Sequence, residues 1–283
     1  MEGFRNRTVA FLEMLPATGL LLGMIAVPLG ILLIASFSSG NQIGGALTLE
    51  NYAEVMEDGV FMRLMGKSIL MGLGVTLATI LIAYPVSYGL AKLVTPKKRG
   101  PLVALIITPF FTSQLLLIYS MMVLLQGQGP VMSFLGLFGV DPSSGILYTD
   151  AAVFLILLYE FLPYMVLCLY STLSKIDDNV LLAARTLGAG RVRRFFSVIF
   201  PLSLPGLLSG ILLVFVPVTG SFVEPDLAGG VNGMMVGSLI NSNFASAYNL
   251  GRGAALSVLF LLILTLLTLL IHVVLKRAGR RAS

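Results

Sequence analysis

The sequence has no tryptophan, one cysteine and one histidine, and only 11% of its 283 residues are charged. A soluble domain carries about 25% charged residues, so this composition excludes a soluble globular protein. A single cysteine cannot form an intrachain disulfide, and Cys168, inside a hydrophobic stretch, is expected to be a packed thiol. His272 has no second His or Cys to share a metal with, so no metal site and no membrane enzyme with converging catalytic groups is expected.

What the sequence does have is hydrophobic residues, which make up 57% of it, give it a mean hydropathy of +0.97 and fall in long stretches. A helix needs about 20 mostly apolar residues to cross about 30 Å of hydrocarbon. Because backbone groups in lipid must be paired within the segment, such stretches predict helices and an all-α integral membrane protein. Six stretches meet the length requirement: Leu15–Phe37, Ser68–Leu90, Pro101–Leu125, Ala151–Leu173, Pro201–Val223 and Ala254–Leu275.

The basic residues predict the orientation of these spans. Of the 18 Lys and Arg residues, all but Arg63, Lys67 and Arg252 fall on one side. The positive-inside rule makes that side cytoplasmic, so we expect residues 1–14 and the basic tail 276–283 in the cytoplasm, flanking a transmembrane domain over 15–275. The net charge of +5 is then explained by the orientation of the chain in the membrane, and no nucleic-acid partner is expected.

Two outer segments have features of their own. Leu47–Lys67 shows helical periodicity with Thr48 in the position of an N-cap, and it predicts a short helix along the outer surface. Gly229–Gly253 is rich in Gly and Asn and predicts a loop or a broken helix that enters the membrane.

One basic cytoplasmic loop, residues 174–200, interrupts the hydrophobic stretches. Asp177 and Asp178 suit a helix N-terminus, and Gly188 suits a helix end, where a left-handed residue is needed. A second amphipathic helix is expected from Arg191. Periodicity alone leaves two interpretations open: a hairpin on membrane lipid with arginines against anionic headgroups, or a loop that docks on another protein.

The spacing of small residues in this loop resembles a known pattern. Ala183, Ala184, Gly188, Val198 and Pro201 fall at the spacing of the "EAA" loop of ATP-binding-cassette importer permeases. From about Asn51 onward the chain resembles the spermidine/putrescine (polyamine) permeases of that class. The segments that carry this resemblance are LTLENY, AYPVSYGLAKL, ITPFFTSQLLLIYS, LPYMVLCLYSTLSKID, LLAARTLGAGRVRRFFSVIFPLSLPG and SFVEPDLAGG.

The resemblance implies a six-helix fold of the type I importer permease kind with a cytoplasmic coupling helix, in a bacterial inner membrane. It also implies partners: a cytoplasmic ATPase dimer that binds ATP and Mg, a second homologous permease, and an extracytoplasmic solute-binding protein. The chain itself has no phosphate-binding loop motif, so no cofactor is expected on it. The residues implied to couple it to the ATPase are Leu182, Ala183, Ala184, Gly188, Ala189 and Arg191.

This chain departs from the family pattern at two positions of the loop. Leu182 stands where the family has glutamate, and Phe200 stands where it has leucine before the proline. The missing carboxylate implies weaker coupling, a compensating ATPase surface, or a partner permease that keeps the glutamate.

Glu160 lies inside the fourth predicted span, three positions before Pro163, and an ionisable residue at that depth is a functional candidate. It suits contact with a solute cation, or alternatively a hydrogen bond between helices. Glu224 and Asp226 at the outer end of the fifth span suit attraction of cations, contact with a binding protein, or an ordinary solvated loop. Tyr119 and Tyr248 are further candidates to line the pathway.

The predicted function is therefore a permease subunit for a small solute, with a polyamine as the leading substrate class. An amino-acid derivative, a phosphonate or a metal complex remains an alternative. A secondary transporter is the rival of another class, and it would need paired repeats or a chain of intramembrane charges, of which only Glu160 is found.

Overall fold

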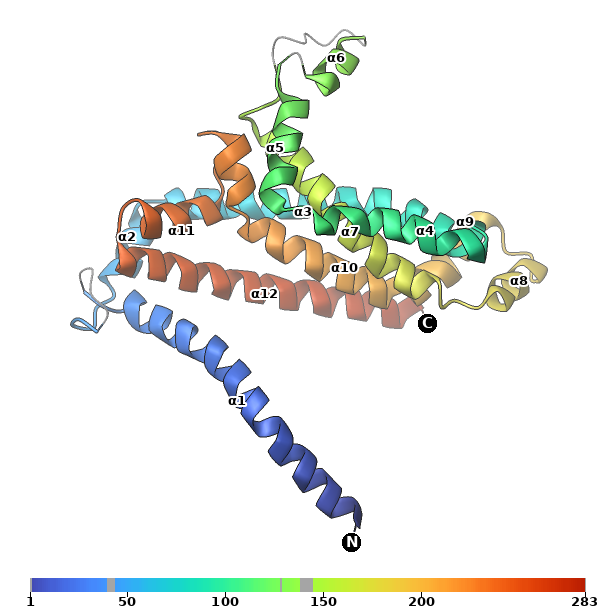
Figure 1. Cartoon of the computed structure of the whole chain (residues 1–283), viewed down its shortest axis with the longest axis horizontal. Helices are drawn as coiled ribbons and strands as arrows, with labels where there is room; N and C mark the ends of the chain where they lie inside the picture. Colours follow the sequence, from blue (N-terminus) through green and yellow to red (C-terminus); the bar gives the residue numbers. More distant parts are fainter. Residues whose placement is uncertain (1, 40–43, 128, 138–144, 283) are drawn as a thin grey trace. The chain divides into compact units, whose positions relative to one another are not determined.

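The structure is a computed structural model that describes residues 2–39, 44–127, 129–137 and 145–282 (Figure 1). Within these ranges the chain is helical, and the only β-type pairing is an isolated bridge between Ser38 and Leu47. The chain divides into two compact units, Met1–Met62 with Ile240–Leu262, and Arg63–Leu239 with Ile263–Ser283.

The described residues contain six helical segments that are long and apolar enough to cross a membrane. They confirm the predicted all-α membrane fold, with boundaries that differ from the expected ones at several ends. The segments are Thr18–Ser36, Val60–Leu93, Gln114–Phe134, Asp150–Leu173, Arg191–Gly220 and Leu250–Val274.

The first unit contains α1 (Glu2–Ser36), α2 (Glu50–Glu57), the start of α3 (Val60–Tyr88), the end of α11 (Val236–Ala245) and the first part of α12 (Leu250–Ala282). Polar contacts tie α2 to the end of α1: the Asn51 amide donates to the Ser36 carbonyl at 3.1 Å, and the Tyr52 hydroxyl donates to the Ser36 hydroxyl at 2.7 Å. An ion pair joins Arg252 of α12 to Asp58.

The predicted outer helix Leu47–Lys67 is divided in two. The α2 helix ends at Glu57, and Gly59 takes a φ of +64° before α3 begins at Val60. The N-cap of α2 is Leu49, which makes no side-chain cap, so the N-cap expected at Thr48 is one residue off. The Thr48 hydroxyl accepts a hydrogen bond from the Glu50 backbone N–H at 3.1 Å. The second half of the expected surface helix is therefore the first part of the second span.

The second unit is built around α7 (Asp150–Leu173) and α10 (Phe200–Gly220), which pack side by side (Figure 1). Their approach depends on small residues: a Cβ added to Gly206 would lie 2.5 Å from the Cys168 carbonyl oxygen, and one added to Gly210 would lie 2.5 Å from the Met165 sulfur. Close packing through glycine is the usual way in which membrane helices associate. Cys168 is half-buried in this contact and unpaired.

The remaining elements of this unit follow the chain. They are the rest of α3, the π-helical segment η1 (Gly89–Leu93), α4 (Pro96–Ile107), the 3₁₀ turn η2 (Thr108–Phe111), α5 (Gln114–Leu125), α6 (Pro130–Gly136), α8 (Asp178–Thr186), α9 (Arg191–Arg194), η4 (Phe195–Ile199) and η5 (Pro225–Gly229).

The expected third span, Pro101–Leu125, is not one helix. The α4 helix ends at Ile107, and Thr112 and Ser113 are extended, with ψ of 140° and 134°, before α5 begins. Pro109 has no N–H to continue the helical hydrogen bonding, which favours a break at this place. The fifth span also differs, because α9, η4 and α10 run on without a gap and Ser221, at ψ 142°, ends them.

The segment Gly229–Gly253 is a broken helix, one of the two forms expected for it. It contains the end of η5, then α11, and α12 from Leu250. The prolines Pro163 and Pro217, by contrast, lie inside continuous helices.

Candidate functional site

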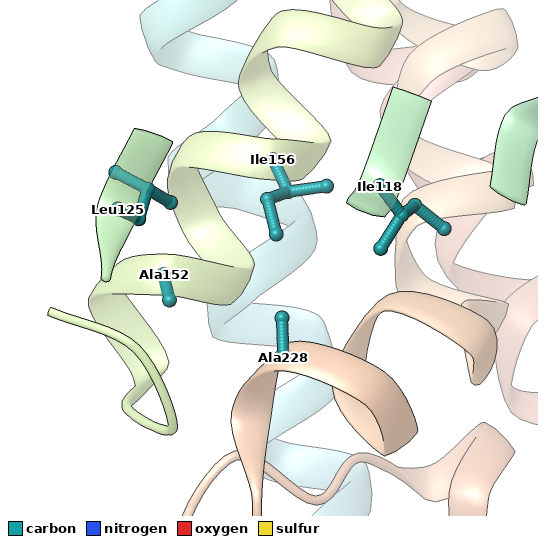
Figure 2. Close-up of a cluster of buried hydrophobic side chains, with 5 residues drawn as sticks. All are labelled: Ile118, Leu125, Ala152, Ile156 and Ala228. Carbon is teal, nitrogen blue, oxygen red and sulfur yellow. The ribbon is translucent and has the colours of Figure 1, made fainter. Parts of the chain in front are cut away.

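A cluster of buried apolar side chains joins α5, α7 and η5 and fixes the position of three polar residues (Figure 2). Its members are Ile118, Leu125, Ala152, Ile156 and Ala228. Gln114 lies one helical turn before Ile118, Glu160 one turn after Ile156, and Glu224 four positions before Ala228. Residues four apart share a face of a helix, so packing of the apolar cluster brings these polar side chains together as well.

Glu224 is 1% exposed and accepts hydrogen bonds at both carboxylate oxygens. The Gln114 amide donates to its Oε1 at 2.8 Å, and the Ser221 hydroxyl donates to its Oε2. All three residues lie at helix breaks, Gln114 after the break before α5 and the other two after the end of α10. Breaks of this kind expose backbone and side-chain polar groups at membrane depth, and they occur where these groups line a binding site or a cavity.

Glu160 supplies the second carboxyl group. Its side chain lies near those of Glu224 and Gln114. Its Oε2 is buried and has no hydrogen-bond partner among the described residues. Glu160 follows the start of α7 by about 15 Å of helix at 1.5 Å per residue, which is about half of the hydrocarbon thickness.

This arrangement is suited to bind a cation with hydrogen-bond donors. An unpaired buried acceptor destabilises a structure by about 1–3 kcal/mol, and by more when it is charged. A solute that donates a hydrogen bond to Glu160 Oε2 removes this destabilisation, which favours its binding. A primary ammonium group offers three donors and one positive charge, which match two carboxyl groups and an amide oxygen. No cluster of three or more potential metal ligands of the His, Cys, Asp and Glu types occurs in the described part of the chain.

The structure thus unites two of the five residues predicted for the pathway. Asp226 is an exposed residue of η5, and Tyr119 on α5 is 53% exposed. Neither belongs to the carboxyl cluster formed by Glu160, Glu224 and Gln114. Tyr248 lies in the other unit, with a φ of +49°. The sequence did not predict a role for Gln114 or Ser221. The feature that both share in the sequence is a polar side chain next to the end of an apolar stretch.

The cytoplasmic loop has the local structure that its sequence predicts. Asp177 caps α8 by accepting from the Asn179 N–H at 2.9 Å. At the other end, Gly188 has a φ of +80°, its N–H donates to the Arg185 carbonyl at 3.0 Å, and the Ala189 N–H donates to the Ala184 carbonyl at 3.1 Å. This pair of hydrogen bonds is the Schellman motif, so the loop ends its helix with a defined geometry.

Most of the predicted coupling residues lie on the surface of this loop. Ala183, Gly188 and Arg191 are exposed, and Ala184 and Ala189 are half-buried. The apolar side chain of Leu182 is 58% exposed and that of Leu187 is 87% exposed. No residue of α8 is buried within this chain, so the helix presents an apolar surface of its own.

Lys92, at the end of the second span, connects α8 to the rest of the unit. Its ammonium donates to Asp178 Oδ1 at 2.7 Å and to the Ile176 carbonyl. The hydrogen bond and charge of Lys92 lower the pKa of the Asp178 carboxyl from its usual value. The lysine side chain is 8% exposed and the aspartate side chain 79% exposed, so the contact joins a buried cation to an exposed loop.

Comparisons with known proteins agree on one family. A family model described as "Binding-protein-dependent transport system inner membrane component" matches residues 90–282. The spermidine/putrescine transport system permease protein PotB of Escherichia coli is 38% identical over 78% of this chain and 80% of its own length. The PotB protein of Haemophilus influenzae is 34% identical over 93% of both chains.

A solved structure has the same fold across nearly the whole chain. It is a chain of a bacterial alginate ABC transporter, crystallised in complex with an alginate pentasaccharide-bound periplasmic protein. The TM-score is 0.79 at 12% identity, covering 98% of this chain and 97% of that one.

Proposed function

The chain belongs to the family of inner membrane components of binding-protein-dependent transport systems, and we propose that the solute it passes is a polyamine such as spermidine or putrescine. The chain is a transporter subunit and not an enzyme. The names of its relatives support the proposed substrate class, and so does the chemistry of the carboxyl cluster.

The observation that carries this proposal is the unpaired Oε2 of Glu160 beside Glu224. Glu160 lies inside a membrane span, where an ionisable residue is expensive to maintain and marks solute pathways. Gln114 and Ser221 occupy the oxygens of Glu224 and orient it, which leaves Glu160 as the acceptor for an arriving ammonium group.

The chain lacks an ATP-binding motif, so energy must come from partners. In our proposal an ATPase dimer with ATP and Mg binds the exposed surface of α8, and ATP-driven closure of that dimer moves the spans. A second, homologous permease completes the pathway, and an extracytoplasmic solute-binding protein delivers the polyamine. The surplus of Lys and Arg supports an orientation with residues 1–14, the loop 174–200 and the tail 276–283 in the cytoplasm.

Reconstituted transport tests the proposal. The complex of this chain with its partner permease, ATPase and binding protein is placed in proteoliposomes, and uptake of labelled spermidine and putrescine is measured with and without internal ATP. We expect ATP-dependent uptake that a neutral diol of the same length does not inhibit. Uptake of a neutral or anionic solute with no polyamine uptake would contradict the substrate class.

A separate control addresses the rival transport mechanism. The purified chain without its partners should not accumulate solute in response to an ion gradient. Accumulation by the chain alone would identify a secondary transporter and overturn the dependence on ATP.

A further inference from the structure

A cavity of about 610 Å³ lies beside the cytoplasmic loop and is not part of the carboxyl cluster. Pro85 and Tyr88 of α3 line one wall, Phe195 and Ile199 of η4 line another, and Leu181 of α8 borders it. Its volume is within the range of about 300–1,000 Å³ that is usual for ligand sites. The walls are apolar and aromatic, so the occupant must be apolar over most of its length.

Both π-helical segments at this end of the unit border the cavity. Leu93 belongs to η1 and Phe195 to η4, and each segment continues a transmembrane helix. A π-helical turn widens a helix by one residue and occurs frequently at functional sites. The opening lies between α3 with η1 and α9 with η4, so the two π-helical segments form part of its walls.

Two arginines of α9 give the cavity its charge. Arg191 and Arg194 line it, and neither guanidinium has a hydrogen-bond or ion-pair partner in the described ranges. No Asp or Glu lines the cavity. An apolar pocket with two unpaired guanidinium groups is complementary to an amphiphile with an anionic headgroup.

We propose that this cavity binds one anionic phospholipid of the cytoplasmic leaflet, with an acyl chain against Pro85, Tyr88 and Ile199 and the phosphate on Arg191 and Arg194. The cytoplasmic leaflet carries the anionic lipids that attract basic residues near a span. The assignment of the leaflet depends on the proposed orientation, and it does not depend on which solute is transported.

The cavity lies on a different side of α8 from the surface that we propose binds the ATPase. Leu181 borders the cavity, whereas Leu182 and Leu187 are exposed. On a helix with 100° per residue these two leucines point about 100° and 240° away from Leu181. The lipid therefore supports α8 from one side while the opposite surface stays free for a protein partner.

Lipid retention by the purified transporter complex tests this site. The complex is exchanged into nanodiscs with phosphatidylglycerol or phosphatidylcholine of the same acyl chains, and bound lipid is counted by native mass spectrometry after release. We expect retention of phosphatidylglycerol over phosphatidylcholine. Arg194→Gln should weaken that retention about fivefold, since it removes a basic residue that contacts the lipid headgroup in the cavity.

Two further variants separate the site from the general basic surface. Arg193→Gln removes the same charge from the same loop, but Arg193 is exposed and does not line the cavity, so retention should not change. Leu181→Trp places a larger side chain at the wall of the cavity without a change of charge and should lower retention of phosphatidylglycerol. Bound lipid is counted in the absence of solute, so the result does not depend on whether the complex transports a polyamine.

Three results would overturn the proposal. These are equal retention of the two lipids, equal losses in the Arg193 and Arg194 variants, and a photo-crosslinker at position 181 that labels a partner protein instead of phosphatidylglycerol. The last result would show that protein fills the cavity in the assembled complex.

Discussion

The carboxyl cluster and the cytoplasmic loop are built in opposite ways. Glu160, Glu224 and Gln114 come from three elements that are distant in sequence, and they meet because the apolar cluster packs one turn away from each. The loop 174–200 is set by adjacent residues: Asp177 begins its helix and Gly188 ends it. The first region is polar and partly buried, with Glu224 buried, Glu160 half-buried and Gln114 exposed, whereas the second is exposed and partly apolar.

This difference agrees with two different tasks. A polar cluster with a buried, unpaired acceptor is selective, because that acceptor favours a solute that satisfies it. An exposed apolar helix with defined ends suits a protein interface, where the surface must keep its shape before the partner arrives. Changes in the two regions should therefore have separable effects on solute recognition and on coupling.

The largest effect is expected from the carboxyl pair. Glu160→Gln or Glu224→Gln should lower kcat/KM of spermidine uptake by roughly 10- to 100-fold, because a hydrogen bond to a charged group contributes about 1.5–3 kcal/mol. The double variant should be little worse than either single one, since both groups serve one ammonium. Uptake in proteoliposomes is the measurement.

Glu57→Gln is the matched control, since it removes an exposed carboxylate from α2. Its uptake should equal that of the wild type. Independent, additive losses at Glu160 and Glu224 would contradict a shared site.

The second effect concerns the helix end at Gly188. An added Cβ meets no atom within 4 Å, so any effect of Gly188→Ala comes from the φ of +80° alone. An L-residue in this conformation costs roughly 1–2 kcal/mol, so stimulated ATP hydrolysis should fall about 5- to 30-fold if the loop must hold this turn to dock. ATPase assays of the complex with loaded binding protein measure it.

Two loop variants serve as controls for that result. Gly188→Asn should keep most activity, because Asn tolerates the left-handed region. Gly190→Ala should be mild, since Gly190 has a φ of −62° that any residue adopts. Equal losses of ATP hydrolysis in the Gly188→Ala and Gly190→Ala variants would contradict the explanation based on the positive φ of Gly188.

A third and smaller effect is expected at Leu182, which replaces the family's glutamate. Its side chain is 58% exposed, so Leu182→Ala should leave the thermal unfolding of the complex unchanged. If docking buries this side chain, the affinity for the ATPase should fall by about fivefold, in line with the apolar area lost. Subunit binding measured by titration tests this, and a lowered unfolding temperature would mean that Leu182 packs within its own chain.

The smallest effect is expected from the ion pair between Lys92 and Asp178. Lys92→Gln should raise amide hydrogen exchange at residues 177–181 by less than about fivefold, because an ion pair with a solvent-exposed carboxylate contributes little. Since Lys92 lowers the pKa of Asp178, the pair is present above the carboxyl's ordinary value and is lost only as pH falls through the lower, folded value. Exchange protection that varies between about pH 5 and pH 8 would contradict this assignment.

The contrast between the regions also explains what the sequence could predict. Hydrophobic length identified the six spans, and capping chemistry identified Asp177 and Gly188, because both signals act over a few neighbouring residues. The break at Thr112 and Ser113 was missed because a continuous apolar stretch hides it, although Pro109 marks the place. Gln114 and Ser221 could not be assigned, since their role depends on the distance to Glu224 in the folded chain.

One measurement tests directly whether solute recognition belongs to the carboxyl cluster and coupling to the loop. Uptake of spermidine and hydrolysis of ATP are followed on the same proteoliposomes for Glu160→Gln and Gly188→Ala. We expect Glu160→Gln to lose uptake while hydrolysis stimulated by loaded binding protein persists, and Gly188→Ala to lose both in the same proportion. Loss of both activities in the same proportion in the two variants would contradict the assignment of recognition to the carboxyl cluster and of coupling to the loop.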